Sequence, residues 1–203
     1  MDSEFAIEFT RIFLACFYTF VAAFYIVRLS RKSTDGKNLV FSGEKYSATW
    51  WNHLLFRWFR VAIWAACLIR VFFPSFDQFL GVLQVLHHWP LIVLGNVLLI
   101  AGFVATVLVH KSMGHLWRSG IDPQGPSNLK TDSYFQFSRN PMFVSVALAQ
   151  LGFFLAFPSV FSLICLLLGW AALHRQILAE EQHLSAHFRY QYQNYRKRVP
   201  RWL

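Results

Sequence analysis

The chain has 203 residues, of which 56% are hydrophobic and only 14% are charged, and it contains 22 phenylalanines and 8 tryptophans. A soluble domain of this length seldom carries such an apolar excess. Because the apolar residues form long blocks, the composition indicates a polytopic membrane protein. The formal net charge of +9 could suit nucleic-acid binding, but the basic residues lie between the apolar blocks, where positive-inside topology explains them better. The three cysteines stand apart inside apolar blocks without a CxxC pair, which argues against a disulfide framework or a zinc site.

Three apolar blocks in the first part of the chain are long enough to cross a bilayer, which takes about 20 apolar residues. They cover residues 9–29, 54–73 and 90–110. Acidic rather than basic residues precede the first block and no small-residue cleavage site follows it, so we expect a retained anchor and not a signal peptide. The second block contains Arg57 and Arg60 one helical turn apart, and we interpret both as side chains that reach the membrane interface.

A fourth apolar run, residues 141–179, is too long for a single crossing. A Phe-Pro-Ser sequence at residues 157–159 divides it, because an internal proline removes a helical hydrogen bond and favours a break. The sequence thus predicts an all-α fold, a polytopic membrane helical bundle of five transmembrane helices whose last two form a tight hairpin. Without an internal repeat, residues 1–203 form a single membrane domain. Residues 1–110 contain three anchor helices, and residues 111–203 contain a polar loop, the hairpin and a basic tail.

Positive charge is distributed unevenly among the connections. Seven lysines and arginines lie between residues 28 and 60, four between residues 111 and 139, and five after residue 179, whereas residues 74–89 contain none. With five crossings, this places the N-terminus outside and the tail in the cytoplasm. We expect an integral multi-pass protein of the cytoplasmic membrane in a prokaryote, or of the endoplasmic reticulum in a eukaryote.

An Arg-Asn-Pro triplet at residues 139–141 opens the predicted hairpin. Asparagine is a favoured N-cap, proline suits the first helical turn, and arginine suits the interface, so the triplet has a purely structural interpretation. The free N–H groups of a helix start also bind anionic groups of ligands. The triplet alone leaves both interpretations open.

The acidic pair Glu180-Glu181 closes the hairpin on a face that is otherwise basic. Carboxylates at the end of a transmembrane helix are uncommon and usually have partners. Arg175, Arg189 and the basic tail could pair with them, so a structural role and a functional role are equally supported. Neighbouring helical residues diverge by about 100°, so only one of the two should face a given pocket.

The loop at residues 114–122 combines Gly, His, Trp, Arg and Asp beside the membrane, and polar residues recur at 128–132. It is neither a Walker loop nor a Rossmann fingerprint. His115 and Trp117 suit a membrane interface, and we assign them no chemistry. The loop is nevertheless too polar to be a simple connector.

An ordered set of short segments lies on both sides of the predicted hairpin. They are WRSGID at 117–122, LKTDSYF at 129–135, RNPMF at 139–143, Glu180-Glu181, Phe188, Tyr192, Tyr195, and VPRW at 199–202. Together they resemble the integral-membrane methyltransferases of the isoprenylcysteine carboxyl methyltransferase type, a group that includes phospholipid N-methyltransferases. No single segment is specific, but their order around a membrane hairpin is.

The resemblance implies methyl transfer from S-adenosyl-L-methionine to a membrane-embedded or lipid-linked acceptor on the cytoplasmic face of the bilayer. It assigns cofactor contacts to the following residues: Ser127, Asn128, Leu129, Lys130, Phe135, Asn140, Pro141, Met142, Phe143 and Glu180. Arg139 or Arg175 would hold an acidic group of the acceptor. We expect no metal, since displacement at a sulfonium depends on alignment and on exclusion of water.

The chain departs from the family pattern at three positions. Phe135 stands where tyrosine is usual, Asn140 where eukaryotic members have histidine, and Gln176 where prenylcysteine enzymes place an arginine for the substrate carboxylate. The acceptor therefore stays open among a carboxylate, a phospholipid amine and a small thiol. An NADPH-dependent membrane reductase of similar architecture is an alternative, as is a non-enzymatic scaffold or transporter with Asn96 and Gln150 in mid-span.

Overall fold

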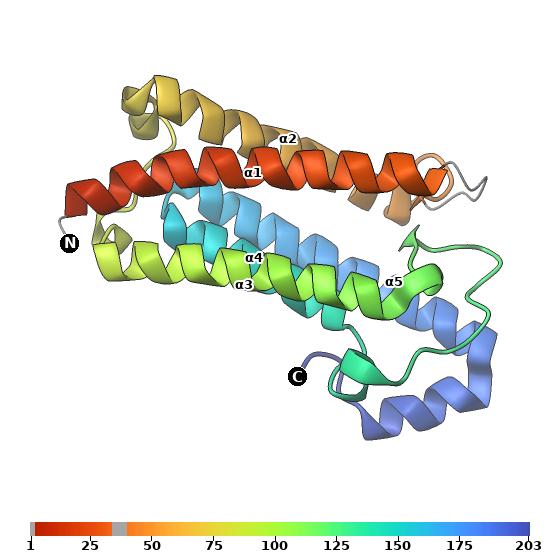
Figure 1. The fold of residues 1–203 in the computed structure, drawn as a ribbon. Coiled ribbons are helices and arrows are strands. Elements are labelled where there is room, and N and C mark those ends of the chain that lie inside the picture. Colours follow the sequence, from red (N-terminus) through yellow and green to blue (C-terminus); the bar gives the residue numbers. More distant parts are fainter. Residues whose placement is uncertain (1–2, 34–39) are drawn as a thin grey trace.

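The computed structural model describes residues 3–33 and 40–203. Lys37 lies outside the described residues, as do the side chains of Arg31, Lys32 and His115. Figure 1 shows helices packed side by side in a bundle, so the predicted all-α fold is confirmed. The helices are α1 (Ser3–Ser33), α2 (Ala48–Phe72), α3 (Trp89–Met113), α4 (Pro141–Ala156) and α5 (Val160–Arg198).

Short elements occupy the connections between the helices. The 3-10 turns are η1 (Pro74–Gln78), η2 (Gln84–Leu86), η3 (Gly114–Leu116) and η4 (Ser133–Gln136). Strands β1 (Val40–Phe41) and β2 (Ser119–Gly120) pair in parallel. This pairing fixes the segment before α2 against the loop that follows α3.

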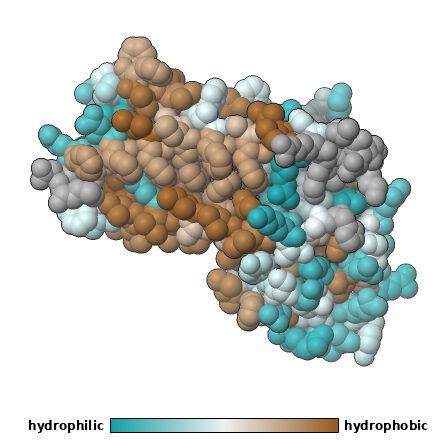
Figure 2. Space-filling model, in the orientation of Figure 1, coloured by the Kyte–Doolittle hydropathy of each residue, from teal (hydrophilic) through white to brown (hydrophobic). Residues whose placement is uncertain are grey.

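In the described part of the chain, three helices are long and apolar enough to cross a membrane. They are Glu4–Arg28 of α1, the whole of α3, and α5. Helix α4 is also apolar, but its 16 residues rise only about 24 Å. On the face shown in Figure 2, apolar side chains cover most of the bundle, whereas polar side chains gather over the C-terminal part of α5 and the neighbouring loop.

The hairpin between α4 and α5 breaks at residues 157–159, as the sequence predicts. Ser159 and Ser162 form a capping box, in which each side chain accepts a hydrogen bond from the other residue's backbone N–H at 3.1 Å. The backbone N–H of Leu83 donates to the Pro158 carbonyl at 2.9 Å. The loop before α3 therefore fixes the turn of the hairpin from outside.

Three glycines bring the backbones of α3 and α4 into direct contact: Gly95, Gly102 and Gly152. A Cβ atom added at Gly102 would lie 2.5 Å from the Ala149 nitrogen, and one at Gly152 would lie 2.3 Å from the Leu99 nitrogen. Small residues commonly allow such close approach between membrane helices. The backbones of α3 and α4 are therefore in direct contact, and the two helices form a rigid pair within the bundle.

Helix α5 continues beyond the predicted end of the apolar run and makes most of the predicted tail helical. At Arg189 the backbone leaves the helical region (φ 38°, ψ −107°), and the last turns change direction (Figure 1). A 39-residue helix would be roughly 58 Å long, about twice the hydrocarbon core of a bilayer. Only its apolar part, residues 160–179, suits the membrane. Residues 114–140 and 180–203 together form what we call the polar lobe.

The end of the chain folds back against the loop before α4. Tyr192 and Tyr195 are buried there, and the Tyr195 hydroxyl donates to the Phe135 carbonyl at 2.6 Å. The backbone N–H of Arg139 donates to the Pro200 carbonyl at 2.9 Å. These contacts bring the last residues of the chain to the start of the hairpin.

Candidate active site

A cavity of about 690 Å³ lies among the helices and extends into the polar lobe. All five helices line it, together with residues 117–120 of the loop after α3. Within the bundle most of the lining residues are apolar, among them Phe17, Leu99 and Phe153, and a smaller number are polar or charged. The cavity therefore joins a lipid-like environment to a polar one.

The polar end of the cavity brings together residues from the start of α4 and from α5. Seven of the residues predicted from the sequence line the cavity: Phe135, Arg139, Asn140, Pro141, Met142, Phe143 and Glu180. Gln176 lines it too, and its Nε2 donates to the Glu180 carboxylate at 3.0 Å. The Oε1 atom of Gln176 is buried and has no hydrogen-bond partner among the described residues. The Glu180 carboxylate and the Oε1 atom of Gln176 thus lie at the same cavity as the start of α4.

The other five predicted site residues do not line this cavity: Ser127, Asn128, Leu129, Lys130 and Arg175. The first two are exposed, and Leu129 packs against the buried tyrosines of the polar lobe. Lys130 Nζ lies 2.9 Å from a carboxylate oxygen of Asp132. Arg175 is exposed, whereas its neighbour Gln176 is buried.

Glu180 and Glu181 face different surroundings, as their divergence on a helix predicts. The Glu181 carboxylate accepts hydrogen bonds from Asn140 Nδ2 and Arg201 Nη2, both at 3.0 Å, and Arg139 Nη2 lies 3.4 Å away. Burial raises the pKa of Glu181, but the hydrogen bonds from Arg201 and Asn140 and the charge of Arg139 outweigh it and lower the pKa overall. Glu181 therefore connects the end of the chain to the start of α4.

Glu180 is the carboxylate that faces the cavity, and it lies just beyond the apolar residues 160–179. Burial raises its pKa to about 7, although the hydrogen bond from Gln176 acts in the opposite direction. A carboxyl group with such a pKa can change its charge in response to a ligand near neutral pH. Perturbed groups of this kind in a cavity are typical of functional sites.

Helix α4 begins where the Arg-Asn-Pro triplet indicates. Asn140 occupies the N-cap position, but its side chain makes no capping hydrogen bond. Its amide donates instead to the Glu181 carboxylate and to the Arg201 carbonyl at 3.1 Å. A hydrogen bond to a charged carboxylate is stronger than one between neutral groups, which accounts for this choice. The start of α4 is consequently left without a side-chain cap beside the cavity.

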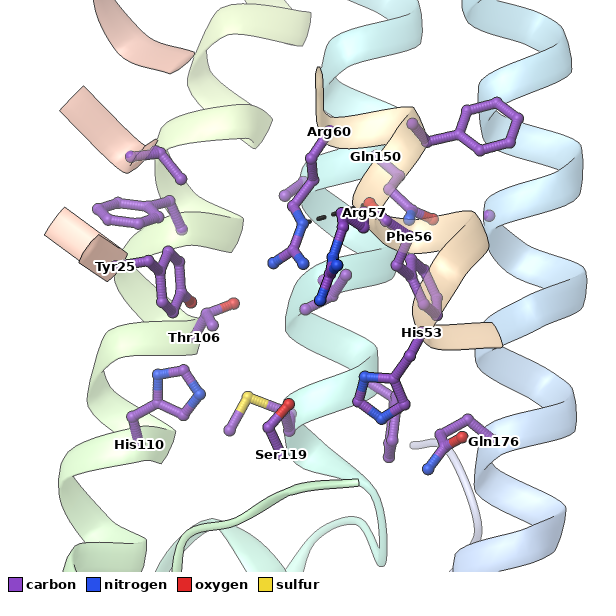
Figure 3. A pocket seen from close by; sticks show the side chains of 18 of the residues that line it. Tyr25, His53, Phe56, Arg57, Arg60, Thr106, His110, Ser119, Gln150 and Gln176 are labelled. Atoms are coloured by element: carbon purple, nitrogen blue, oxygen red, sulfur yellow. Dashed lines mark hydrogen bonds between the residues drawn. The ribbon is translucent and has the colours of Figure 1, made fainter. Parts of the chain in front are cut away.

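Several polar side chains in the cavity were missed by the sequence analysis, most of all those of α2. Figure 3 shows His53, Arg57 and Arg60 on one helix, with Tyr25 and Thr106 on the opposite side of the cavity. From the sequence alone, the two arginines are predicted to reach the membrane interface. The spacing of positions 53, 57 and 60 places all three on one helical face, which is the signal that could have grouped them.

The family model for phospholipid methyltransferases matches residues 90–191, which is half of the chain. The match covers α3, the loop after it, α4 and most of α5, and it leaves out α1 and α2. No curated protein and no solved structure matches the chain. The match confirms the resemblance to membrane methyltransferases and favours that reaction class over a reductase, a scaffold or a transporter. The chain therefore belongs to the phospholipid methyltransferase family and is a membrane methyltransferase.

Proposed function

We propose that this protein transfers a methyl group from S-adenosyl-L-methionine to a lipid or lipid-linked acceptor at the polar end of the cavity. The observation that carries the proposal is the Glu180 carboxylate, which faces the same space as residues 139–143. The family match supports the reaction class. The mostly apolar walls of the rest of the cavity support an acceptor with hydrocarbon chains.

The polar end suits a zwitterionic cofactor that carries a cationic sulfur. Glu180 and the unpaired Oε1 of Gln176 can accept hydrogen bonds from ribose hydroxyls or an ammonium group. Arg139 Nε and Nη1 are buried without a hydrogen-bond partner in the described part of the chain, and they can donate to a carboxylate. Phe135 and Phe143 offer aromatic faces to a sulfonium. When bound, the cofactor supplies an activated methyl group for in-line displacement by an acceptor lone pair.

The protein itself contributes by aligning the cofactor with the acceptor and by excluding water. Glu181 holds both Asn140 and Arg139, and so fixes the helix start that borders the cavity. The apolar helices keep water from the acceptor side. We retain Ser127 to Lys130 as cofactor contacts and Arg175 as an acceptor contact on the resemblance alone, because none of them lines the cavity.

We propose five membrane crossings, with the N-terminus outside and the polar lobe in the cytoplasm. The basic segments after α3 and after residue 179 both belong to this lobe, in agreement with the positive-inside rule. Helix α4 is short for a crossing, and it packs against α3 and α5 within the bundle. The active site would then open toward the cytoplasmic leaflet.

Among the possible acceptors, we favour a phospholipid amine over a prenylcysteine carboxylate. Gln176 occupies the position at which prenylcysteine enzymes place an arginine, carries no charge, and donates to Glu180. Arg175 beside it is exposed and outside the cavity. The name of the matched family points in the same direction.

Calorimetric titration of the purified protein with S-adenosylmethionine, S-adenosylhomocysteine and NADPH tests the proposal. We expect both adenosyl compounds to bind and NADPH not to bind. Glu180→Ala should weaken adenosyl binding by about tenfold or more, because it removes a hydrogen-bond acceptor for a polar or charged group.

Glu44→Ala is the matched control, since Glu44 is an exposed carboxylate outside the cavity. It should bind S-adenosylhomocysteine as the unaltered protein does. Failure of the unaltered protein to bind either adenosyl compound would refute the proposal. An equal loss of affinity in both variants would show that Glu180 acts only through net charge.

A further inference from the structure

Two arginines of α2 line the cavity and have no acidic partner among the described residues. Neither Arg57 nor Arg60 forms an ion pair with any residue that the structure describes. Arg60 Nε donates to the Phe56 carbonyl of its own helix at 3.2 Å, which leaves the other donors of its guanidinium available. The arginines at the opposite end of the bundle differ, since Arg11 and Arg70 share the carboxylate of Asp77.

The direction of these side chains does not suit a simple interface role. Figure 3 shows the guanidinium groups of Arg57 and Arg60 inside the cavity, between Thr106 of α3 and Gln150 of α4. Both arginines are exposed along the open cavity, and two cations one helical turn apart repel each other, so an anion bound between them would be favourable. Two guanidinium groups that face one cavity and have no acidic partner in the described part of the chain indicate an anionic ligand.

The order of residues along α2 indicates which part of a ligand this anion would be. Asn52 and His53 lie at the polar end, where His53 adjoins Gly120 of β2. Arg57 and Arg60 follow, and Ile63 and Trp64 come next among apolar walls. From His53 to Trp64 the helix rises about 16 Å. The sequence of environments is polar, cationic and then apolar, which is the order of headgroup, phosphate and acyl chain in a phospholipid.

We propose that Arg57 and Arg60 bind the phosphate of the acceptor lipid and thereby position its headgroup toward Glu180. The inference rests on the proposed function. Guanidinium groups bind phosphate oxygens through paired N–H donors, which one ammonium group does not do. Helix α2 lies outside residues 90–191, so this proposal assigns acceptor recognition to a part of the chain that the family match does not cover.

Calorimetry in dodecyl maltoside at moderate salt tests this assignment with three probes: dioctanoyl phosphatidic acid, dioctanoylglycerol and inorganic phosphate. Phosphatidic acid should bind the unaltered protein, and dioctanoylglycerol and inorganic phosphate should bind at least about tenfold more weakly. Arg57→Gln with Arg60→Gln should weaken phosphatidic acid binding by about tenfold or more, as expected for hydrogen bonds between charged groups.

The control variant is Lys45→Gln with Lys111→Gln, which removes the same charge from exposed residues outside the cavity. It should bind phosphatidic acid as the unaltered protein does. Both double variants are also titrated with S-adenosylhomocysteine, whose affinity should stay unchanged. This titration reports folding and keeps the test of the acceptor site separate from that of the cofactor site.

The outcomes separate the two proposals. If S-adenosylhomocysteine binds but phosphatidic acid binds the arginine variant as tightly as the unaltered protein, the phosphate assignment is overturned and the proposed function stands. Equal binding of dioctanoylglycerol would also overturn it, because the phosphate would then contribute nothing. Equal binding of inorganic phosphate would assign the arginines to a free anion in place of a lipid. An equal loss of phosphatidic acid affinity in the lysine control would show that the effect comes from lost positive charge in general, and it would overturn the assignment.

Discussion

The acidic pair of α5 shows how adjacent residues of one type take different roles. Glu181 is surrounded by Asn140, Arg139 and Arg201, whereas Glu180 has Gln176 as its hydrogen-bond partner and faces the cavity. The pKa of Glu181 is lowered, and that of Glu180 is raised to about 7. One carboxylate is therefore structural, and the other is suited to respond to a ligand.

Affinity for S-adenosylhomocysteine should fall as the pH decreases through 7. The pKa of Glu180 is raised, so the group is ionised at about pH 8 and protonated at about pH 6, and only the ionised form offers a full charge to an ammonium group. Between these values the affinity should fall about tenfold, as the ionised fraction does. Calorimetry across this range measures it. Glu180→Gln should give a flatter profile, and parallel profiles for the two proteins would contradict the assignment.

Glu181→Ala should destabilise the protein by roughly 3 kcal/mol, because it leaves buried Arg139 and Asn140 without their carboxylate partner. Because its pKa is lowered, the stabilisation by Glu181 is present above its unfolded-state pKa of 4.5 and is lost as the pH falls below that value. Chemical unfolding in detergent at neutral pH measures the change. The exposed neighbour Gln182→Ala should stay close to the unaltered protein, and similar losses in both variants would contradict this role.

At the scale of elements, the contact between α3 and α4 depends on glycine. The two helices approach so closely that a side chain at Gly152 would meet the backbone of Leu99 rather than a movable side chain. This pair supports the start of α4, which borders the polar end of the cavity. The packing of α3 against α4 therefore affects the candidate site, because it holds in place the helix whose start borders the cavity.

Gly152→Val should destabilise the bundle by about 3 kcal/mol or prevent folding, because its side chain would have to displace the backbone of α3. The temperature of unfolding in detergent and the yield of monodisperse protein measure this effect. Gly169→Ala is the matched control, since the atoms nearest to its Cβ would be those at the end of the Gln150 side chain, which can move. Equal behaviour of the two variants would show that the close approach does not limit stability.

At the scale of the whole molecule, an apolar bundle carries a polar lobe at one end (Figure 2). Five crossings require the turn after α2 and the end of α5 to lie on opposite sides of the membrane. In a variant with Cys16, Cys67 and Cys165 replaced by serine, a cysteine at the exposed position Gln78 should react with an impermeant maleimide in intact cells.

A cysteine at the exposed position Gln193, introduced into the same background, should react only after the membrane is permeabilised. Labelling of both positions from one side would require an even number of crossings between them and would refute the proposed topology. The unaltered cysteine-free protein serves as the control for background labelling.

Local properties of the sequence determined the class of fold and the position of its main break. Length and hydropathy predict where helices cross a membrane, and the Phe-Pro-Ser sequence at 157–159 predicts the hairpin turn, because proline acts within its own helix. The extension of α5 to Arg198 was not predicted, since polar helices are stabilised by what they pack against. The order of motifs around the hairpin was also enough to indicate the family.

Only the tertiary structure decided which polar residues share the cavity. Asn140 looks like a helix cap in sequence, but the folded chain brings Glu181 to its amide. Arg57 and Arg60 look like interface residues, but the packing of α2 against α1 and α5 places both of them along the cavity. A side chain's role at a site depends on partners far away in sequence, and a sequence by itself specifies only near neighbours along the chain. The membrane bundle could therefore be predicted from the sequence, whereas only the fold showed which of Glu180 and Glu181 faces the cavity.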